Sequence, residues 1–150
     1  YYDCYFACGD NFKNRFSYKF KKNQFPKKII NTCSFDYTRY LDFDNVNKKN
    51  IDEPYCIFLD ENNLNHLDLL YHNVDPLVHN NYIKEIKNFF KNYEEVTKCK
   101  VIIAKHPKNH MNDFDEYKNI DNILEYIDNC KEIIMHASMS ISFPIIYKKS

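Results

Sequence analysis

The stretch YCIFLDE, residues 55–61, decides the fold that we expect for this chain. Its first five residues are all apolar, whereas a strand with one face in water alternates apolar and polar residues. Four further runs are nearly as continuous, and they are residues 4–8, 28–33, 101–104 and 133–135. Short runs of this kind are typical of strands buried on both faces, so the sequence predicts a parallel sheet.

Segments with helical spacing lie between these runs. Over residues 80–95, Ile83, Ile86 and Phe90 fall on one stripe and lysines take the other side, which predicts an amphipathic helix. Two shorter helices are expected over residues 120–128 and 138–148, the second kinked or shortened by its proline. Alternating strands and helices are typical of doubly wound α/β proteins, so we expect a Rossmann-like fold.

A polar stretch divides the chain. Residues 45–54, NVNKKNIDEP, are charged and end in proline, and we expect them to link two structural units over residues 1–44 and 55–150. The length of 150 residues suits one domain, or one domain with part of another.

Composition excludes several classes of protein. Basic and acidic residues number 21 each, so there is no net charge to support nucleic-acid binding. No apolar run approaches the length that crosses a bilayer. Gly9 is the only glycine, and this excludes the dinucleotide fingerprint and the P-loop, which both need several.

Cysteine and histidine spacing gives no sign of a metal centre. The six cysteines form no CxxC pair, so we expect reduced, buried thiols and no zinc site. His66 and Asp68 could together bind a metal, but exposure in a loop is the simpler interpretation. Other histidines in expected loops are His72, His79 and His110. No metal ion or other cofactor is predicted.

Polar side chains follow three of the expected strands. In chain order they are Asp60 and Glu61, then Lys105, His106, Pro107 and Lys108, then His136, Ser138 and Ser140. Because ligands of open α/β sheets bind outside the carboxyl ends of the strands, we expect these residues to meet at one edge.

The residues at this edge are suited to an anion. His106 and Lys108 would bring positive charge, while Ser138 and Ser140, at the start of the last expected helix, would add hydroxyl and backbone N–H donors. A diphosphate or a nucleoside monophosphate fits such a set of donors.

Each of these residues also has a purely structural explanation. Ser138 could be only a helix N-cap, and His136 could be a hydrogen-bonded histidine of the core. His106 followed by proline is a common turn, and the two carboxylates could simply begin an exposed loop. Their joint occurrence at successive strand ends favours a binding site.

The same residues resemble one enzyme family. YCIFLDE, then VIIAKHPK over residues 101–108, then EIIMHASMSISFPIIYKKS over residues 132–150 are similar to the C-terminal domain of bacterial GT-B glycosyltransferases that build capsule or lipopolysaccharide. Related patterns occur in bacterial sialyl- and polysialyltransferases and in the glycerophosphate polymerases of teichoic acid synthesis. Residues 1–44 resemble the end of the first domain of such an enzyme.

The resemblance implies a nucleotide-sugar donor, a glycan or lipid-linked acceptor, and a cytoplasmic enzyme at the inner face of the membrane. It identifies His106 and Pro107 as a His-Pro motif, and His136, Ser138 and Ser140 as a Ser-rich motif, which together hold the donor phosphate. His106 and Ser138 would stabilise the leaving phosphate. Asp60 or Glu61 would contact the acceptor, the ribose or a water.

The resemblance also implies a fragment that is cut at its C-terminal end, since a two-domain enzyme needs about twice this length. Three alternatives stay open. One is a sialyl- or glycerophosphotransferase with a CMP- or CDP-linked donor, and another is a non-catalytic module that binds a nucleotide or a glycan. The third is a plain α/β domain whose polar strand ends bind nothing.

Overall fold

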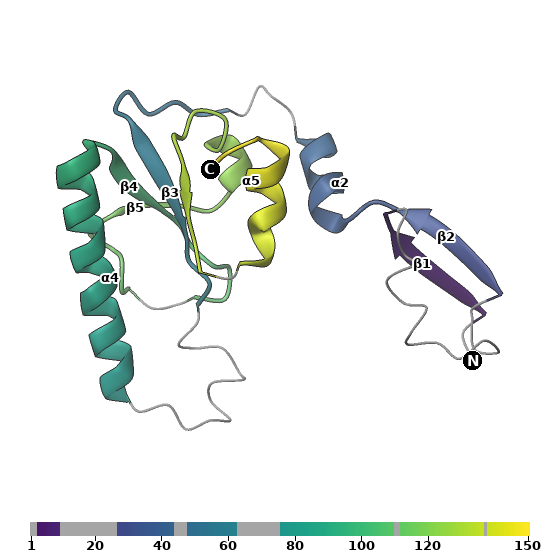
Figure 1. The fold of residues 1–150 in the computed structure, drawn as a ribbon, viewed down its shortest axis with the longest axis horizontal. Helices are drawn as coiled ribbons and strands as arrows, with labels where there is room; N and C mark the ends of the chain where they lie inside the picture. The colour runs from purple at the N-terminus through teal and green to yellow at the C-terminus, as the bar shows by residue number, and fades with distance from the viewer. Residues whose placement is uncertain (1–2, 10–26, 44–47, 63–75, 110–111, 137) are drawn as a thin grey trace. The chain divides into compact units, whose positions relative to one another are not determined.

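The computed structural model describes residues 3–9, 27–43, 48–62, 76–109, 112–136 and 138–150 (Figure 1). The chain divides into two compact units, Tyr1–Asp42 and Phe43–Ser150. Residues 48–54, expected to be part of a linker, belong to the second unit. The Lys49 N–H donates to the Glu125 carbonyl at 2.7 Å, and Ile51 packs against a core of this unit.

The first unit contains a pair of parallel strands and a helix. Strand β1, Cys4–Cys8, pairs with β2, Lys28–Thr32, in the positions that the apolar runs predict. Helix α2, Phe35–Asp42, begins after Ser34, whose Oγ accepts the Tyr37 N–H at 3.2 Å as an N-cap. This helix was not expected, because its Phe, Tyr and Thr residues intrinsically favour strands. The sequence between the two strands has a basic, helix-like pattern, but residues 10–26 lie outside the described residues.

The second unit contains a four-stranded parallel sheet with the order β5-β4-β3-β6. The strands are β3, Tyr55–Leu59; β4, Lys100–Ala104; β5, Lys118–Ile120; and β6, Ile133–Ile134. Helix α4, Pro76–Thr97, connects β3 to β4 and extends beyond the expected residues 80–95 at both ends. The expectation of a Rossmann-like parallel α/β sheet is therefore confirmed.

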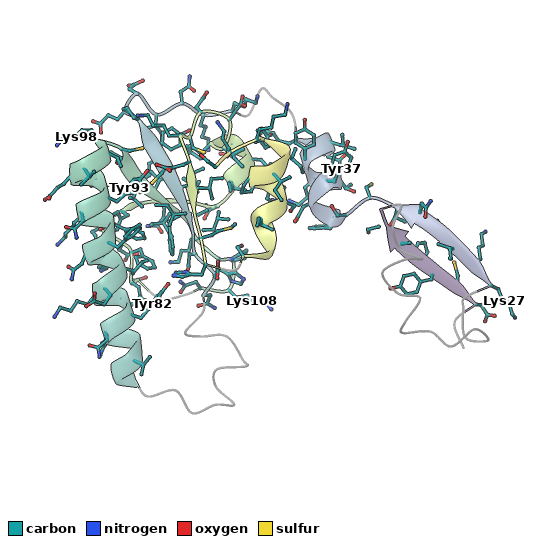
Figure 2. The ribbon with its side chains drawn as sticks, in the orientation of Figure 1. Lys27, Tyr37, Tyr82, Tyr93, Lys98 and Lys108 are labelled. Carbon is teal, nitrogen blue, oxygen red and sulfur yellow. The ribbon has the colours of Figure 1, made fainter. Side chains whose placement is uncertain are left out.

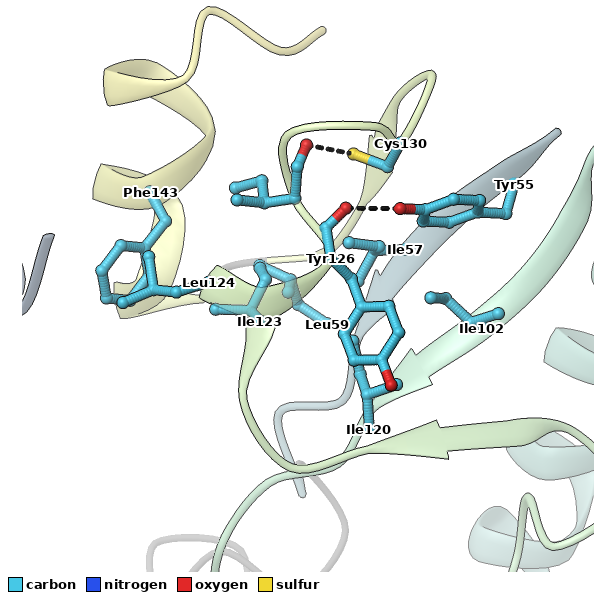
Figure 3. Packing of buried hydrophobic residues seen from close by; sticks show 11 residues of the cluster. Tyr55, Ile57, Leu59, Ile102, Ile120, Ile123, Leu124, Tyr126, Cys130 and Phe143 are labelled. Atoms are coloured by element: carbon cyan, nitrogen blue, oxygen red, sulfur yellow. Dashed lines mark hydrogen bonds between the residues drawn. The ribbon is translucent and has the colours of Figure 1, made fainter. Parts of the chain in front are cut away.

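The two faces of β3 explain why its sequence is continuously apolar. Tyr55, Ile57 and Leu59 belong to one core, which Figure 3 shows together with Phe143 from α5. Cys56 and Phe58 belong to a second core, under α4. Figure 1 shows α4 on one side of the sheet and α5, Ser142–Ile146, on the other. Every residue of this strand is thus covered on its own face.

The prediction of a helix over residues 120–128 is wrong. Ile120 ends the edge strand β5, and a single 3-10 turn, η3, follows at Ile123–Glu125. Asn122 directs this change, because its side chain accepts the Leu124 N–H at 3.2 Å and starts the tight turn. The apolar residues of this stretch are buried as expected, so only their helical conformation was misjudged.

The helix expected over residues 138–148 is shorter and divided. A 3-10 turn, η4, occupies Met139–Ile141, and α5 covers only Ser142–Ile146. Pro144 therefore lies in the first turn of α5, where its missing N–H would have had no helical partner. After the helix, Lys148 takes a left-handed conformation with φ 54°, and the Lys149 N–H closes the end on the Pro144 carbonyl at 2.9 Å.

The cysteines divide evenly between surface and interior. Cys56, Cys99 and Cys130 are buried, as expected. The prediction of burial is wrong for the three cysteines of the first unit, which are exposed. All six thiols are free. Burial raises the pKa of the Cys56 thiol to about 12 and that of Cys130 to about 11, from an ordinary value near 9. The folded state therefore favours neutral thiols at these two positions.

Stability is expected to fall in alkaline solution. A raised folded-state pKa stabilises the fold below the unfolded pKa, and this contribution is lost as the pH rises through the folded value. The thermal midpoint should therefore decrease above about pH 9. The decrease should be smaller in Cys56→Ala and unchanged in Cys4→Ala, whose thiol is exposed. Equal pH profiles in all three proteins would contradict this origin of the effect.

Candidate functional site

The strand order creates a topological switch point between β3 and β6. Along the chain, β4 and β5 add successively on one side of β3, whereas β6 returns to its other side. Ligands of open α/β sheets bind outside the carboxyl ends of the strands at such a point. The residues that follow β3 and β6 therefore occupy the position that this topology favours for binding.

Asp60 joins the end of β3 to the loop after β4. Its Oδ2 accepts the side-chain amide of Asn109 at 2.6 Å and the His106 N–H at 3.3 Å, while Oδ1 accepts the Asn62 N–H at 2.9 Å. A carboxylate with three donors holds the backbone in place. These contacts make Asp60 a positioning residue, and its contact with an acceptor, a ribose or a water stays a prediction.

His106 begins a tight turn that the Asn109 N–H closes on the His106 carbonyl at 2.8 Å. Pro107 takes the second position of this turn, where its fixed φ is suitable. The Lys108 N–H donates to His106 Nδ1 at 3.1 Å. Because Nδ1 is an acceptor here, the neutral imidazole carries its proton on Nε2. The turn therefore leaves one defined imidazole donor for a ligand.

Glu61 anchors the loop after β6, just as Asp60 anchors the loop after β4. Its Oε1 accepts the His136 N–H at 2.9 Å. Two consecutive carboxylates thus tie two loops, on opposite sides of β3, to the end of one strand. Both acidic residues were expected at this edge, but as contacts of the acceptor, the ribose or a water, since nothing local indicates partners 46 and 75 residues away.

The Ser-rich loop combines a structural and a potential binding role. Ser138 caps η4, because its Oγ accepts the Ser140 N–H at 3.1 Å. This is the structural explanation that the sequence left open, and it still leaves the Ser138 hydroxyl hydrogen able to donate. The helix dipole expected here is small, since η4 has three residues and α5 has five.

Two lysines lie in the His-Pro loop. Lys105 is half-buried and Lys108 is exposed, and neither forms an ion pair with another described residue. Figure 2 shows Lys108 at the same end of the sheet as Tyr82 of α4. The nearby carboxylates of Asp60 and Glu61 are already engaged by backbone and amide donors. The loop therefore places two ammonium groups at this edge, alongside the two carboxylates.

Two residues at this edge were not identified from the sequence. Asn109 is 8% exposed and anchors the turn to Asp60. Tyr82 lies beside His136, with 5.8 Å between ring centroids. Burial, reinforced by the negative charges of the two carboxylates, raises the pKa of Tyr82 to about 12, so its phenol is neutral near pH 7. An amphipathic pattern marks Tyr82 only as part of a helix, and a buried amide has no local signature.

Other residues considered from the sequence cannot be placed. His66, Asp68, His72 and His110 lie outside the described residues, and so does the side chain of His79. Within the described part of the chain, no three His, Cys, Asp or Glu side chains gather as metal ligands would.

Comparison with known proteins gives no relative for this chain: no protein-family model matches it, and neither a curated protein nor a solved structure is significantly similar. The resemblance of its motifs to glycosyltransferases therefore stays an interpretation.

Proposed function

We propose that the second unit binds the phosphate of a nucleotide-activated sugar, as the donor-binding part of a glycosyltransferase that builds bacterial surface polysaccharide. The observation that carries this proposal is the pair of carboxylates at the end of β3. Asp60 and Glu61 hold the loops with the His-Pro and Ser-rich motifs on the two sides of the switch point. Such anchoring is what a preorganised anion site requires.

The chemistry would be stabilisation of the leaving group. As the sugar departs, negative charge develops on the nucleotide phosphate. The Nε2–H of His106, the hydroxyl of Ser138 and the ammonium group of Lys108 are suitable donors for that charge. Because their loops are already fixed, little reorganisation would be needed when the charge appears. The sugar would pass to a glycan or lipid-linked acceptor.

The protein would work in the cytoplasm at the inner face of the membrane. Among the described residues, none of the helices combines the length and apolar character that a membrane span requires.

Titration with nucleotides tests the donor site. CMP, CDP, UDP, GDP and their sugars are added to the folded chain and binding is followed by calorimetry or NMR. We expect one nucleotide class to bind saturably, and His106→Ala and Ser138→Ala each to weaken it by about tenfold or more, as expected for hydrogen bonds to charged groups. A CMP or CDP preference would favour the sialyl- or glycerophosphotransferase alternative.

The control for Ser138→Ala is Ser34→Ala, which removes an N-cap of the same kind from the first unit. It should leave nucleotide affinity unchanged. A folded chain that binds none of these nucleotides would rule out the donor site.

A further inference from the structure

Three aromatic rings form a continuous set at the switch-point edge. His136 packs edge-on against Phe58, with ring centroids 6.0 Å apart, and lies 5.8 Å from Tyr82. The three rings differ in exposure: Phe58 is 1% exposed, Tyr82 is half-buried, and His136, which contacts both, is exposed. A buried ring and a half-buried ring thus support an imidazole that reaches water.

Contacts of both its backbone and its side chain fix the position of the exposed His136 ring. Glu61 Oε1 holds the His136 backbone N–H, and the Phe58 and Tyr82 rings contact the imidazole. An exposed aromatic ring that is fixed in this way offers a flat surface for another ring, since stacking tolerates any base with a π-face. A solvated surface histidine would need neither anchor.

We propose that His136, supported by Tyr82, is a stacking platform for the base of the nucleotide. The inference rests on the proposed function, because His136 would contact the base of the same nucleotide whose phosphate the neighbouring donors would bind. His136 and Ser138 are two residues apart, so their Cα atoms are at most about 7 Å apart. The ribose of a nucleoside phosphate bridges a gap of that order between base and phosphate.

This assignment differs from the one that the motif resemblance implies for His136, namely phosphate binding. The two assignments predict different ligand selectivity. A phosphate ligand at residue 136 would recognise ribose 5-phosphate and a nucleotide equally well, whereas a stacking platform contributes only when a base is present.

The test compares CMP, UMP, GMP and AMP with ribose 5-phosphate on the whole chain. In the unchanged protein, we expect the preferred nucleotide to bind about tenfold or more tightly than ribose 5-phosphate, the usual size of one base–aromatic stack. His136→Ala should reduce nucleotide affinity to that of ribose 5-phosphate and leave the affinity for ribose 5-phosphate unchanged. The His136 ring resonances should move upfield on binding of the nucleotide.

Conservative variants separate stacking from other roles. His136→Phe should keep the nucleotide preference, because it keeps a ring, and Tyr82→Phe should change it little, whereas Tyr82→Ala should lose part of it. Phe89→Leu, on an exposed position of α4, is the control and should have no effect.

The outcomes distinguish this proposal from the proposed function. Equal affinity for nucleotide and ribose 5-phosphate in the unchanged protein would overturn the stacking platform and leave a phosphate site. Equal loss of both ligands in His136→Ala would also overturn it. A folded chain that binds neither ligand would overturn both proposals.

Discussion

Replacing Asp60 with alanine is expected to lower the free energy of unfolding by about 3 kcal/mol and to abolish nucleotide binding. The change removes the acceptor of the Asn109 amide and of the His106 N–H. Asn109 is 8% exposed, so its amide would stay buried without this partner. Urea unfolding followed by circular dichroism measures the first effect, and calorimetry below the unfolding transition measures the second.

Two further variants make this result interpretable. Asp60→Asn keeps the shape and one acceptor oxygen but presents an NH₂ group to the second donor, so we expect an intermediate loss of stability. Asp121→Ala changes an exposed carboxylate in the same unit and should alter stability by no more than about 0.5 kcal/mol. An Asp60→Ala protein with unchanged stability and affinity would show that the loop after β4 does not depend on this carboxylate.

Phe58→Ala is expected to lower the free energy of unfolding by about 4 kcal/mol. The Phe58 ring packs edge-on against Phe90 and Phe114, with centroids 4.9 and 5.9 Å apart, and against His136 at the edge of the sheet. Removing it leaves a cavity between the sheet and α4. A loss of this size is a large fraction of the stability of a small domain.

Chemical denaturation again supplies the measurement, and Phe89→Ala is the matched control. Phe89 is the neighbour of Phe90 on α4, but it is 44% exposed, so its truncation should cost much less than that of Phe58. Because Phe58 also supports the imidazole of His136, its truncation should shift the His136 resonances even where the protein stays folded. Comparable destabilisation by both variants would contradict the packing described here.

The strands could be predicted because their signal is local. Each of the five apolar runs overlaps an observed strand, and continuous hydrophobicity correctly indicated burial on both faces of β3. Strand β5 was missed because its sequence, Lys-Asn-Ile, has a single apolar residue. Pairing with β4 holds this strand at the sheet edge, and its own three residues carry no hydrophobic pattern that would predict it.

Helix type and length depended on details that periodicity does not include. One cap at Asn122 was enough to replace an expected helix by a 3-10 turn, and Pro144 set where α5 begins. In the first case the burial of Ile123, Leu124 and Ile127 was predicted correctly, since it follows from their apolar side chains. The backbone conformation depended instead on single polar or proline positions.

The candidate site could be predicted in outline, as side chains at strand ends, but its internal connections could not. Asp60 accepts hydrogen bonds from residues 46 and 49 positions later, and Glu61 accepts one from a backbone N–H 75 positions later. Such partners are fixed only when the parallel strands are aligned. This is also why the sequence suggested ligand contacts for two carboxylates that the folded chain uses to hold its own loops.

The consecutive carboxylates after β3 also determine where this chain can change its length. An insertion or deletion between Leu59 and Glu61 would alter the alignment of both carboxylates with their loops at once, because each is positioned by the same strand end. A change in the length of the segment after Asn62 and before α4 would leave both anchors in place. Between β3 and α4, variation in length is therefore compatible with the site only beyond Asn62, and the link between Leu59 and Asn62 has to keep its length.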